Sequence, residues 1–144
     1  MASHAVLNDE ILHHYGAVLG FVLGCGNIER SQVQKLIEIV SAYPEVAYDM
    51  LLAFIAYQVG RGYVRDGVAR RFIECLKGLS NMKGAKLSRD ELLKVLGMAR
   101  WVYQAISRGR GYVCRGINVD RTMFSDLLNQ FASVEAVISR VLGV

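Results

Sequence analysis

Proline is nearly absent from this sequence, with one residue in 144. Such scarcity favours long helices over a turn-rich β fold. Long apolar runs are missing too, because the uncharged apolar stretches at 18–26 and 50–60 are shorter than the roughly 18 residues of a membrane-spanning helix. Residues 1–9 lack a basic region followed by a cleavage site, so we expect no signal peptide and no membrane partner.

Cysteine is also scarce, and Cys25, Cys75 and Cys114 stand singly without Cys-x-x-Cys spacing. An odd number of isolated cysteines argues against a disulfide framework or a zinc site. We therefore predict buried thiols in a reducing cytoplasm.

Charged residues make up only 21% of the chain, against 53% hydrophobic residues. The mean hydropathy of +0.27 is higher than an ordinary monomeric surface explains. Since no segment is long enough to span a membrane, we predict that apolar faces are buried by self-association. The net charge of +4 is small, so its distribution is more informative than its size.

Apolar residues recur at helical spacing along the whole chain, which predicts a single all-α domain over 1–144. We expect a compact helical bundle of about six or seven helices. The predicted helical ranges are about 8–23, a helix opening at 31, then 45–59, 65–80, 89–107 and 120–142, with a break near 131–133.

Two capping boxes support these boundaries, Ser31 with Gln34 and Ser88 with Glu91. The helix predicted at 45–59 is apolar nearly all round, so it is either central to the domain or covered by a neighbouring subunit.

The most informative feature is a repeat. Gly-Arg-Gly-Tyr-Val occurs at 60–64 and at 109–113, within longer similar segments at 53–76 and 99–128. Each copy lies between helical patterns, so we predict two helix–turn–helix hairpins of similar geometry. The Gly60–Gly62 and Gly109–Gly111 turns would each link two helices.

Arginine is concentrated in these two turns. Spans 57–72 and 100–121 hold nine of the 17 basic residues and only two acids. Guanidinium groups bind phosphates, glycine lets the backbone approach, and tyrosine rings stack on bases, so this pattern favours contact with single-stranded nucleic acid. The side chains predicted to make this contact are Arg61, Tyr63, Arg65, Arg70, Arg71, Arg108, Arg110, Tyr112 and Arg115. We expect the arginines to be exposed on one continuous positive surface.

A structural interpretation of the same arginines is that they complement carbonyls at helix ends and solvate the loops. Trp101 lies opposite the apolar stripe of the helix that begins after Ser88, and we interpret it as a protein-interface anchor rather than a platform for a base.

Nothing in the sequence predicts catalysis. His13 and His14 are adjacent on a helix and point about 100° apart, so they do not form an i, i+4 metal pair. No Ser/His/Asp or Cys/His grouping and no Walker or dinucleotide fingerprint is present. We expect no metal, no cofactor and no enzymatic activity.

Two segments resemble a known family. They are 31–35 (Ser-Gln-Val-Gln-Lys) and 52–61 (Leu-Ala-Phe-Ile-Ala-Tyr-Gln-Val-Gly-Arg). They resemble the small helical subunit of type III CRISPR effector complexes, nearest to the Csm version, with the Cmr or type I-A small subunit next. Ala56-Tyr57 and Gly60-Arg61 match its motif residue by residue.

The resemblance covers about residues 8–107, and this chain departs from it in two ways. Ala53 and Phe54 replace a usual proline and a usual basic residue, and further helices are present where the family normally ends. The resemblance implies a non-catalytic subunit stacked in several copies along guide and target RNA, beside other subunits of the complex. The alternative is a helical protein–protein adaptor whose arginines only solvate its loops.

Overall fold

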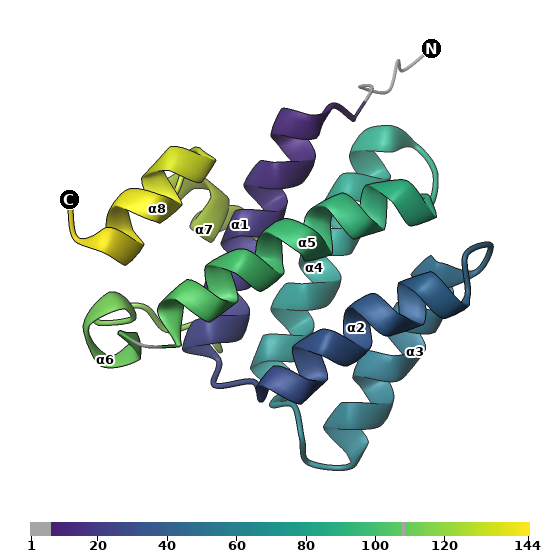
Figure 1. Cartoon of the computed structure of the whole chain (residues 1–144), viewed down its shortest axis with the longest axis horizontal. Coiled ribbons are helices and arrows are strands. Elements are labelled where there is room, and N and C mark those ends of the chain that lie inside the picture. The colour runs from purple at the N-terminus through teal and green to yellow at the C-terminus, as the bar shows by residue number, and fades with distance from the viewer. Residues whose placement is uncertain (1–6, 108) are drawn as a thin grey trace.

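The computed structural model describes residues 7–107 and 109–144, and within them all regular secondary structure is helical (Figure 1). This confirms the predicted all-α bundle, with eight helices in the described part of the chain rather than six or seven. The helices are α1 (Asp9–Cys25), α2 (Arg30–Ala42), α3 (Ala47–Gly60), α4 (Asp66–Lys83), α5 (Arg89–Ile106), α6 (Arg110–Val113), α7 (Phe124–Gln130) and α8 (Val134–Leu142).

Helix α1 is the centre of the bundle. Every residue from Gly16 to Gly24 is buried, and α5 crosses directly over this segment (Figure 1). Glycines at 16, 20 and 24 lie on the side of α1 that faces α5. A Cβ at Gly20 would lie 2.5 Å from the carbonyl oxygen of Ala99, so only glycine permits this close approach of the two helices.

Helix α3, in contrast, lies at the edge of the bundle beside α2 (Figure 1). It buries one side, which includes Leu51 and Ile55, whereas Tyr57 is 58% exposed. The sequence left open whether this helix is central to the domain or covered by a neighbouring subunit, and the structure contradicts the first alternative. The second stays a prediction.

One of the two predicted capping boxes is present. The Ser88 hydroxyl accepts from the Glu91 amide at 3.3 Å, and the Glu91 carboxylate accepts from the Ser88 amide at 2.8 Å. Burial alone would raise the pKa of Glu91, but hydrogen bonds from Lys83 and Ser88 outweigh it and lower the pKa. The capping box predicted at Ser31 is absent. The N-cap of α2 is Glu29, and its side chain makes no capping hydrogen bond.

The cysteines also differ from the prediction. Cys25 at the end of α1 and Cys114 after α6 form a disulfide, so the expectation of thiols at these positions is wrong. The bond joins segments 89 residues apart, which the spacing of the cysteines could not reveal. Cys75 is the buried thiol that was predicted, and burial raises its pKa.

Helices α6, α7 and α8 all pack against α1, while α7 also contacts α4 and α8 also contacts α5. Helices α7 and α8 are separated at 131–133, as predicted, but residues 120–123, which were predicted to begin this helical region, belong to the loop 114–123. None of the described helices is long and apolar enough to cross a lipid bilayer.

Candidate nucleic-acid interface

The first Gly-Arg-Gly-Tyr-Val copy forms the turn between α3 and α4, as predicted. The amides of Tyr63 and Val64 both donate to the Gln58 carbonyl, at 2.9 and 3.3 Å, and close the turn. Val64 is only 6% exposed and anchors the turn to the core. Gly62 has a φ of +79°, a conformation that glycine adopts without steric cost. The turn is thus fixed from inside while its outer surface is open.

Arg61 lies between two exposed tyrosines at this turn. Its guanidinium carbon is 4.7 Å from the centre of the Tyr63 ring and 5.4 Å from that of Tyr57, distances typical of cation–π contacts. The guanidinium also donates to both tyrosine hydroxyls, at 3.3 and 3.4 Å. These hydrogen bonds are long and therefore weak, so they do not commit Arg61 to its present partners. We call these three residues the Tyr–Arg–Tyr cluster.

Sequence reasoning missed Tyr57 as a member of the site. Ala56-Tyr57 was singled out only as a match to the motif of the CRISPR small subunit, and Tyr57 occupies the same place in the first repeat segment as Tyr103 in the second. The two tyrosines have different environments, because Tyr103 is 4% exposed and donates its hydroxyl to the Ile28 carbonyl. The spacing of Tyr57, Arg61 and Tyr63 around one helix end was the signal that could have identified it.

Arg65 and Arg70 are exposed, as predicted, and each has an acidic partner. Arg65 lies 3.5 Å from the Asp120 carboxylate, and Arg70 lies 2.8 Å from that of Asp66. Ion pairs between exposed side chains contribute little stability, so both arginines can exchange these partners for a phosphate. The Arg65–Asp120 pair also links the two repeat segments.

Arg71 corrects the prediction of exposure, because it is 5% exposed and lies inside the fold. Its guanidinium donates to a Glu74 carboxylate oxygen at 3.0 Å and to the Thr122 carbonyl at 2.8 Å. Glu74 in turn accepts from the Phe124 amide at 2.9 Å. The Arg71–Glu74 pair therefore holds the loop before α7 onto α4, and Arg71 does not contribute to the surface.

The second Gly-Arg-Gly-Tyr-Val copy does not form the predicted turn. Its last four residues are the short helix α6, and the next helix begins only at Phe124. The reversal occurs instead at Gly116, which has a φ of +79°. The expectation that the two copies share one hairpin geometry is therefore wrong.

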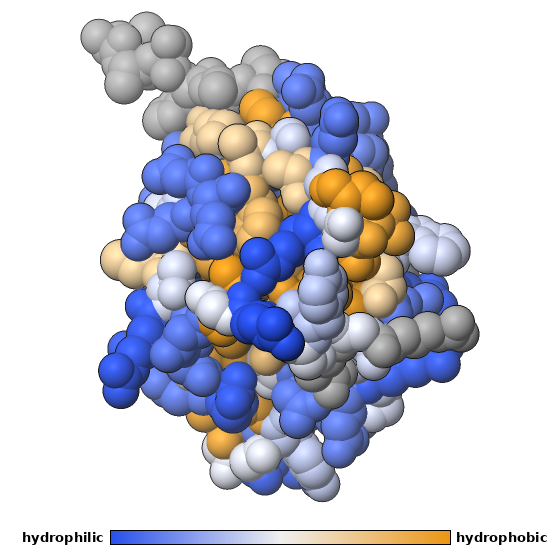
Figure 2. All heavy atoms as spheres, turned by 90° about the vertical axis from the view of Figure 1, so that its left-hand side faces the viewer, coloured by the Kyte–Doolittle hydropathy of each residue, from blue (hydrophilic) through white to orange (hydrophobic). Residues whose placement is uncertain are grey.

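The predicted site residues of this second copy are partly described. Tyr112 is 63% exposed, and Arg115 is exposed at the end of the same segment. Arg108 lies outside the described residues, as does the side chain of Arg110. Figure 2 shows the face that carries α6 and α8, where strongly hydrophilic side chains cross the centre next to a hydrophobic patch.

Trp101 is the most exposed aromatic side chain of the described residues, at 73%. It lies on the outer side of α5, where Arg100 is also exposed. A large apolar ring with so much exposed surface suits a protein contact, and its role as an interface anchor stays a prediction.

The histidine, cysteine and acidic side chains of the described residues are not gathered into a metal-binding cluster. No group of three or more histidine, cysteine or acidic side chains among them is placed to hold a metal ion. His14 lies 2.6 Å from the Phe131 carbonyl oxygen, a contact that joins α1 to the segment between α7 and α8.

Comparison of the chain with protein-family models, curated proteins and solved structures found no match.

Proposed function

We propose that this chain is a non-catalytic nucleic-acid-binding subunit, and that it serves as the small subunit of an RNA-guided CRISPR effector ribonucleoprotein. The observation that carries the proposal is the exposed Tyr–Arg–Tyr cluster. A guanidinium between two rings offers a charge for a phosphate and two faces for unstacked bases. A Cβ at Gly60 or Gly62 would meet no atom within 4 Å, so a strand could approach the backbone closely.

The proposed ligand is single-stranded RNA or a guide–target duplex, and the proposed partners are other subunits and further copies of this chain. The apolar composition of the chain supports self-association. A cytoplasmic location is part of the proposal. The Cys25–Cys114 disulfide then has to form in a cell interior that tolerates such bonds, as those of hyperthermophiles do.

The test is a titration with single-stranded RNA over a range of salt concentrations. Arg61→Ala removes the charge at the centre of the cluster, and we expect affinity to fall about tenfold, with a salt slope smaller by about 0.7. Arg61→Lys keeps a charge without the planar stacking surface and should bind with intermediate affinity. The thermal midpoint should stay nearly constant, because the side chain is exposed.

Arg89→Ala is the matched control. Arg89 is also exposed, and it lies at the start of α5, at the opposite end of the molecule from the α3–α4 turn (Figure 1). Its replacement changes the net charge equally and should alter affinity by less than about twofold. RNA binding by Arg61→Ala equal to that of wild type would refute the proposal.

A second candidate is a helical protein–protein adaptor, which the exposure of Trp101 favours. If this is the function, Trp101→Ala should abolish association with a protein partner, since interface tryptophans commonly contribute about 2 kcal/mol or more. In that case neither wild type nor the Arg61→Ala variant would bind RNA.

A further inference from the structure

The face that carries α6 and α8 has an open pocket of about 410 Å³. Its lining consists of Tyr112, Arg115, Ser139, Arg140, Gly143 and Val144. The size falls within the range of small-molecule sites, and the lining holds two arginines but no acidic side chain. The pocket lies beyond residue 107, outside the segment that resembles the CRISPR small subunit.

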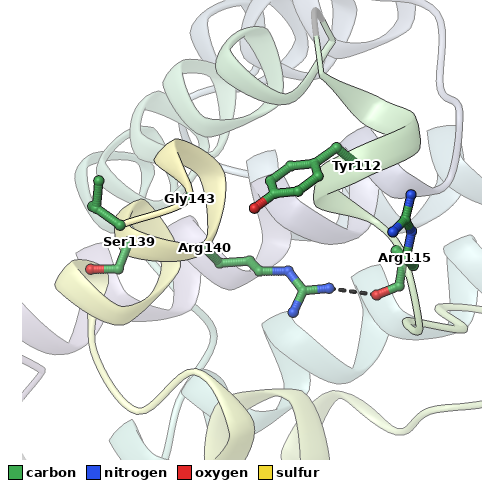
Figure 3. Close-up of a pocket in the computed structure, with 6 residues that line it drawn as sticks. Tyr112, Arg115, Ser139, Arg140 and Gly143 are labelled. Carbon is green, nitrogen blue, oxygen red and sulfur yellow. Dashed lines mark hydrogen bonds between the residues drawn. The ribbon is translucent and has the colours of Figure 1, made fainter.

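Arg140 is held in place by the backbone of the repeat segment. Its side chain donates through Nε to the Val113 carbonyl at 2.9 Å and through Nη2 to the Arg115 carbonyl. Figure 3 shows this guanidinium and the Tyr112 ring on opposite sides of the opening, with Arg115 at the α6 edge. Two hydrogen bonds fix the guanidinium plane, so the charge is oriented before any ligand arrives.

Three carbonyl groups near the pocket already have hydrogen-bond donors. The carbonyls of Val113 and Arg115 are occupied by Arg140. At the end of α8, the Ser139 carbonyl accepts from the amides of Gly143 and Val144, at 2.9 and 3.0 Å. The Arg115 side chain is exposed and has no ion pair with any residue that the structure describes.

We propose that this pocket binds one nucleotide, with its phosphate between Arg115 and Arg140 and its base against the exposed Tyr112 ring. Guanidinium groups recognise phosphate oxygens, and an aromatic ring stacks on any base. The same chemistry is offered by a free nucleotide and by one unit of an RNA strand. The inference deepens the nucleic-acid binding that the sequence predicts for Tyr112 and Arg115 and rests on that proposed function, but the pocket shares no residue with the Tyr–Arg–Tyr cluster.

The experiment measures binding of adenosine 5′-monophosphate, adenosine and hexa-adenylate RNA to the full chain by calorimetry. Arg115→Ala should weaken binding about tenfold, the loss expected for one charge-assisted hydrogen bond. Arg121→Ala is the control, since Arg121 is an exposed arginine that does not line the pocket. Arg140 is left unchanged because its loss would remove two hydrogen bonds to the backbone of the α6 segment. Tyr112→Ala should weaken binding as well, whereas Tyr112→Phe keeps the stacking surface.

A loss with Arg115→Ala, but not with Arg121→Ala, supports the proposal in either arm. If Arg115→Ala weakens binding of the mononucleotide, the ligand is a free nucleotide. If it weakens binding of the hexanucleotide alone, the ligand is one unit of a strand. The proposal is overturned if the Arg115→Ala and Arg121→Ala variants bind each ligand with equal affinity. It is also overturned if wild type binds adenosine as tightly as adenosine 5′-monophosphate and Arg115→Ala does not weaken binding of the hexanucleotide more than Arg121→Ala does. Arg61→Ala should not change mononucleotide binding, so failure of the pocket is distinguishable from failure of the cluster.

Discussion

Gly20 lies where α1 and α5 cross, and its replacement by alanine tests whether close helix contact organises this fold. A methyl group there would lie 2.5 Å from the Ala99 carbonyl oxygen and 2.8 Å from the Val102 Cβ. The first atom belongs to the backbone of α5 and the second is the Cβ of a β-branched residue on the same helix, so neither can rotate away. The two helices would have to separate by about 1 Å to reach ordinary van der Waals contact.

Two terms of opposite sign determine the result. Alanine in place of glycine inside a helix stabilises the folded state by about 1 kcal/mol. Forcing an extra methyl group into a packed core costs about 3 kcal/mol when backbone has to move. We therefore expect Gly20→Ala to lower the free energy of unfolding by about 2 kcal/mol, which corresponds to a decrease of about 6 °C in Tm for a chain of this length.

Gly97→Ala is the control for the first of these terms. Gly97 lies in the interior of α5, and a Cβ there would meet no atom within 4 Å. The same substitution should raise Tm by about 2–3 °C, because only the helix propensity changes. Thermal unfolding followed by circular dichroism measures both variants. A Gly20→Ala protein as stable as wild type, with Gly97→Ala stabilised, would show that α1 and α5 are not in this close contact.

Three further perturbations test the packing. Cys114→Ser removes the disulfide to Cys25, which closes a loop with a sequence separation of 89, and should lower the free energy of unfolding by about 4–5 kcal/mol in a denaturant titration. Arg71→Ala removes the hydrogen bonds to the partly exposed Glu74 carboxylate and to the Thr122 carbonyl and should cost about 2–3 kcal/mol by the same assay, whereas an unchanged midpoint would contradict its structural role. The pKa of Glu91 is lowered in the folded state, so its contribution is present above its unfolded pKa near 4.5 and is lost as the pH falls. Glu91→Gln should therefore flatten the acid side of a stability–pH profile, and an unchanged profile would contradict this.

Helical periodicity predicted the fold class and most of the boundaries because long amphipathic stripes depend mainly on local sequence. It did not identify which apolar helix is central. Both α1 and α3 are apolar on most sides, and composition does not distinguish a buried helix from one that awaits a partner. The spacing of Gly16, Gly20 and Gly24 was the signal for α1, since glycines four residues apart line one side of a helix and permit close packing.

The candidate site was predictable in part, for a similar reason. Arginine clustering located the exposed α3–α4 turn, but charge alone does not show which side of a helix a residue occupies. Arg71 lies three residues after Val68 and four before Cys75, both fully buried, which places it on the core side of α4. The Cys25–Cys114 pairing and the α6–α8 pocket depend on contacts between distant segments, which no local pattern reveals.

The two Gly-Arg-Gly-Tyr-Val copies show how one short sequence keeps its side-chain environments while its backbone changes. Val64 and Val113 are both buried, and Tyr63 and Tyr112 are both exposed. The backbones already differ within the copies, because residues 61–64 form an irregular turn whereas Arg110–Val113 form α6. After the first copy α4 begins at once, whereas the second is tied to α1 by the disulfide and then reverses at Gly116. Burial of the valine fixes where each tyrosine emerges, and the neighbouring helices decide what lies beside it. The first tyrosine therefore stacks with Arg61 at an open turn, and the second faces Arg140 across a pocket. If both bind RNA, the first copy should tolerate any strand, and the second should require a phosphate at a fixed distance from a base.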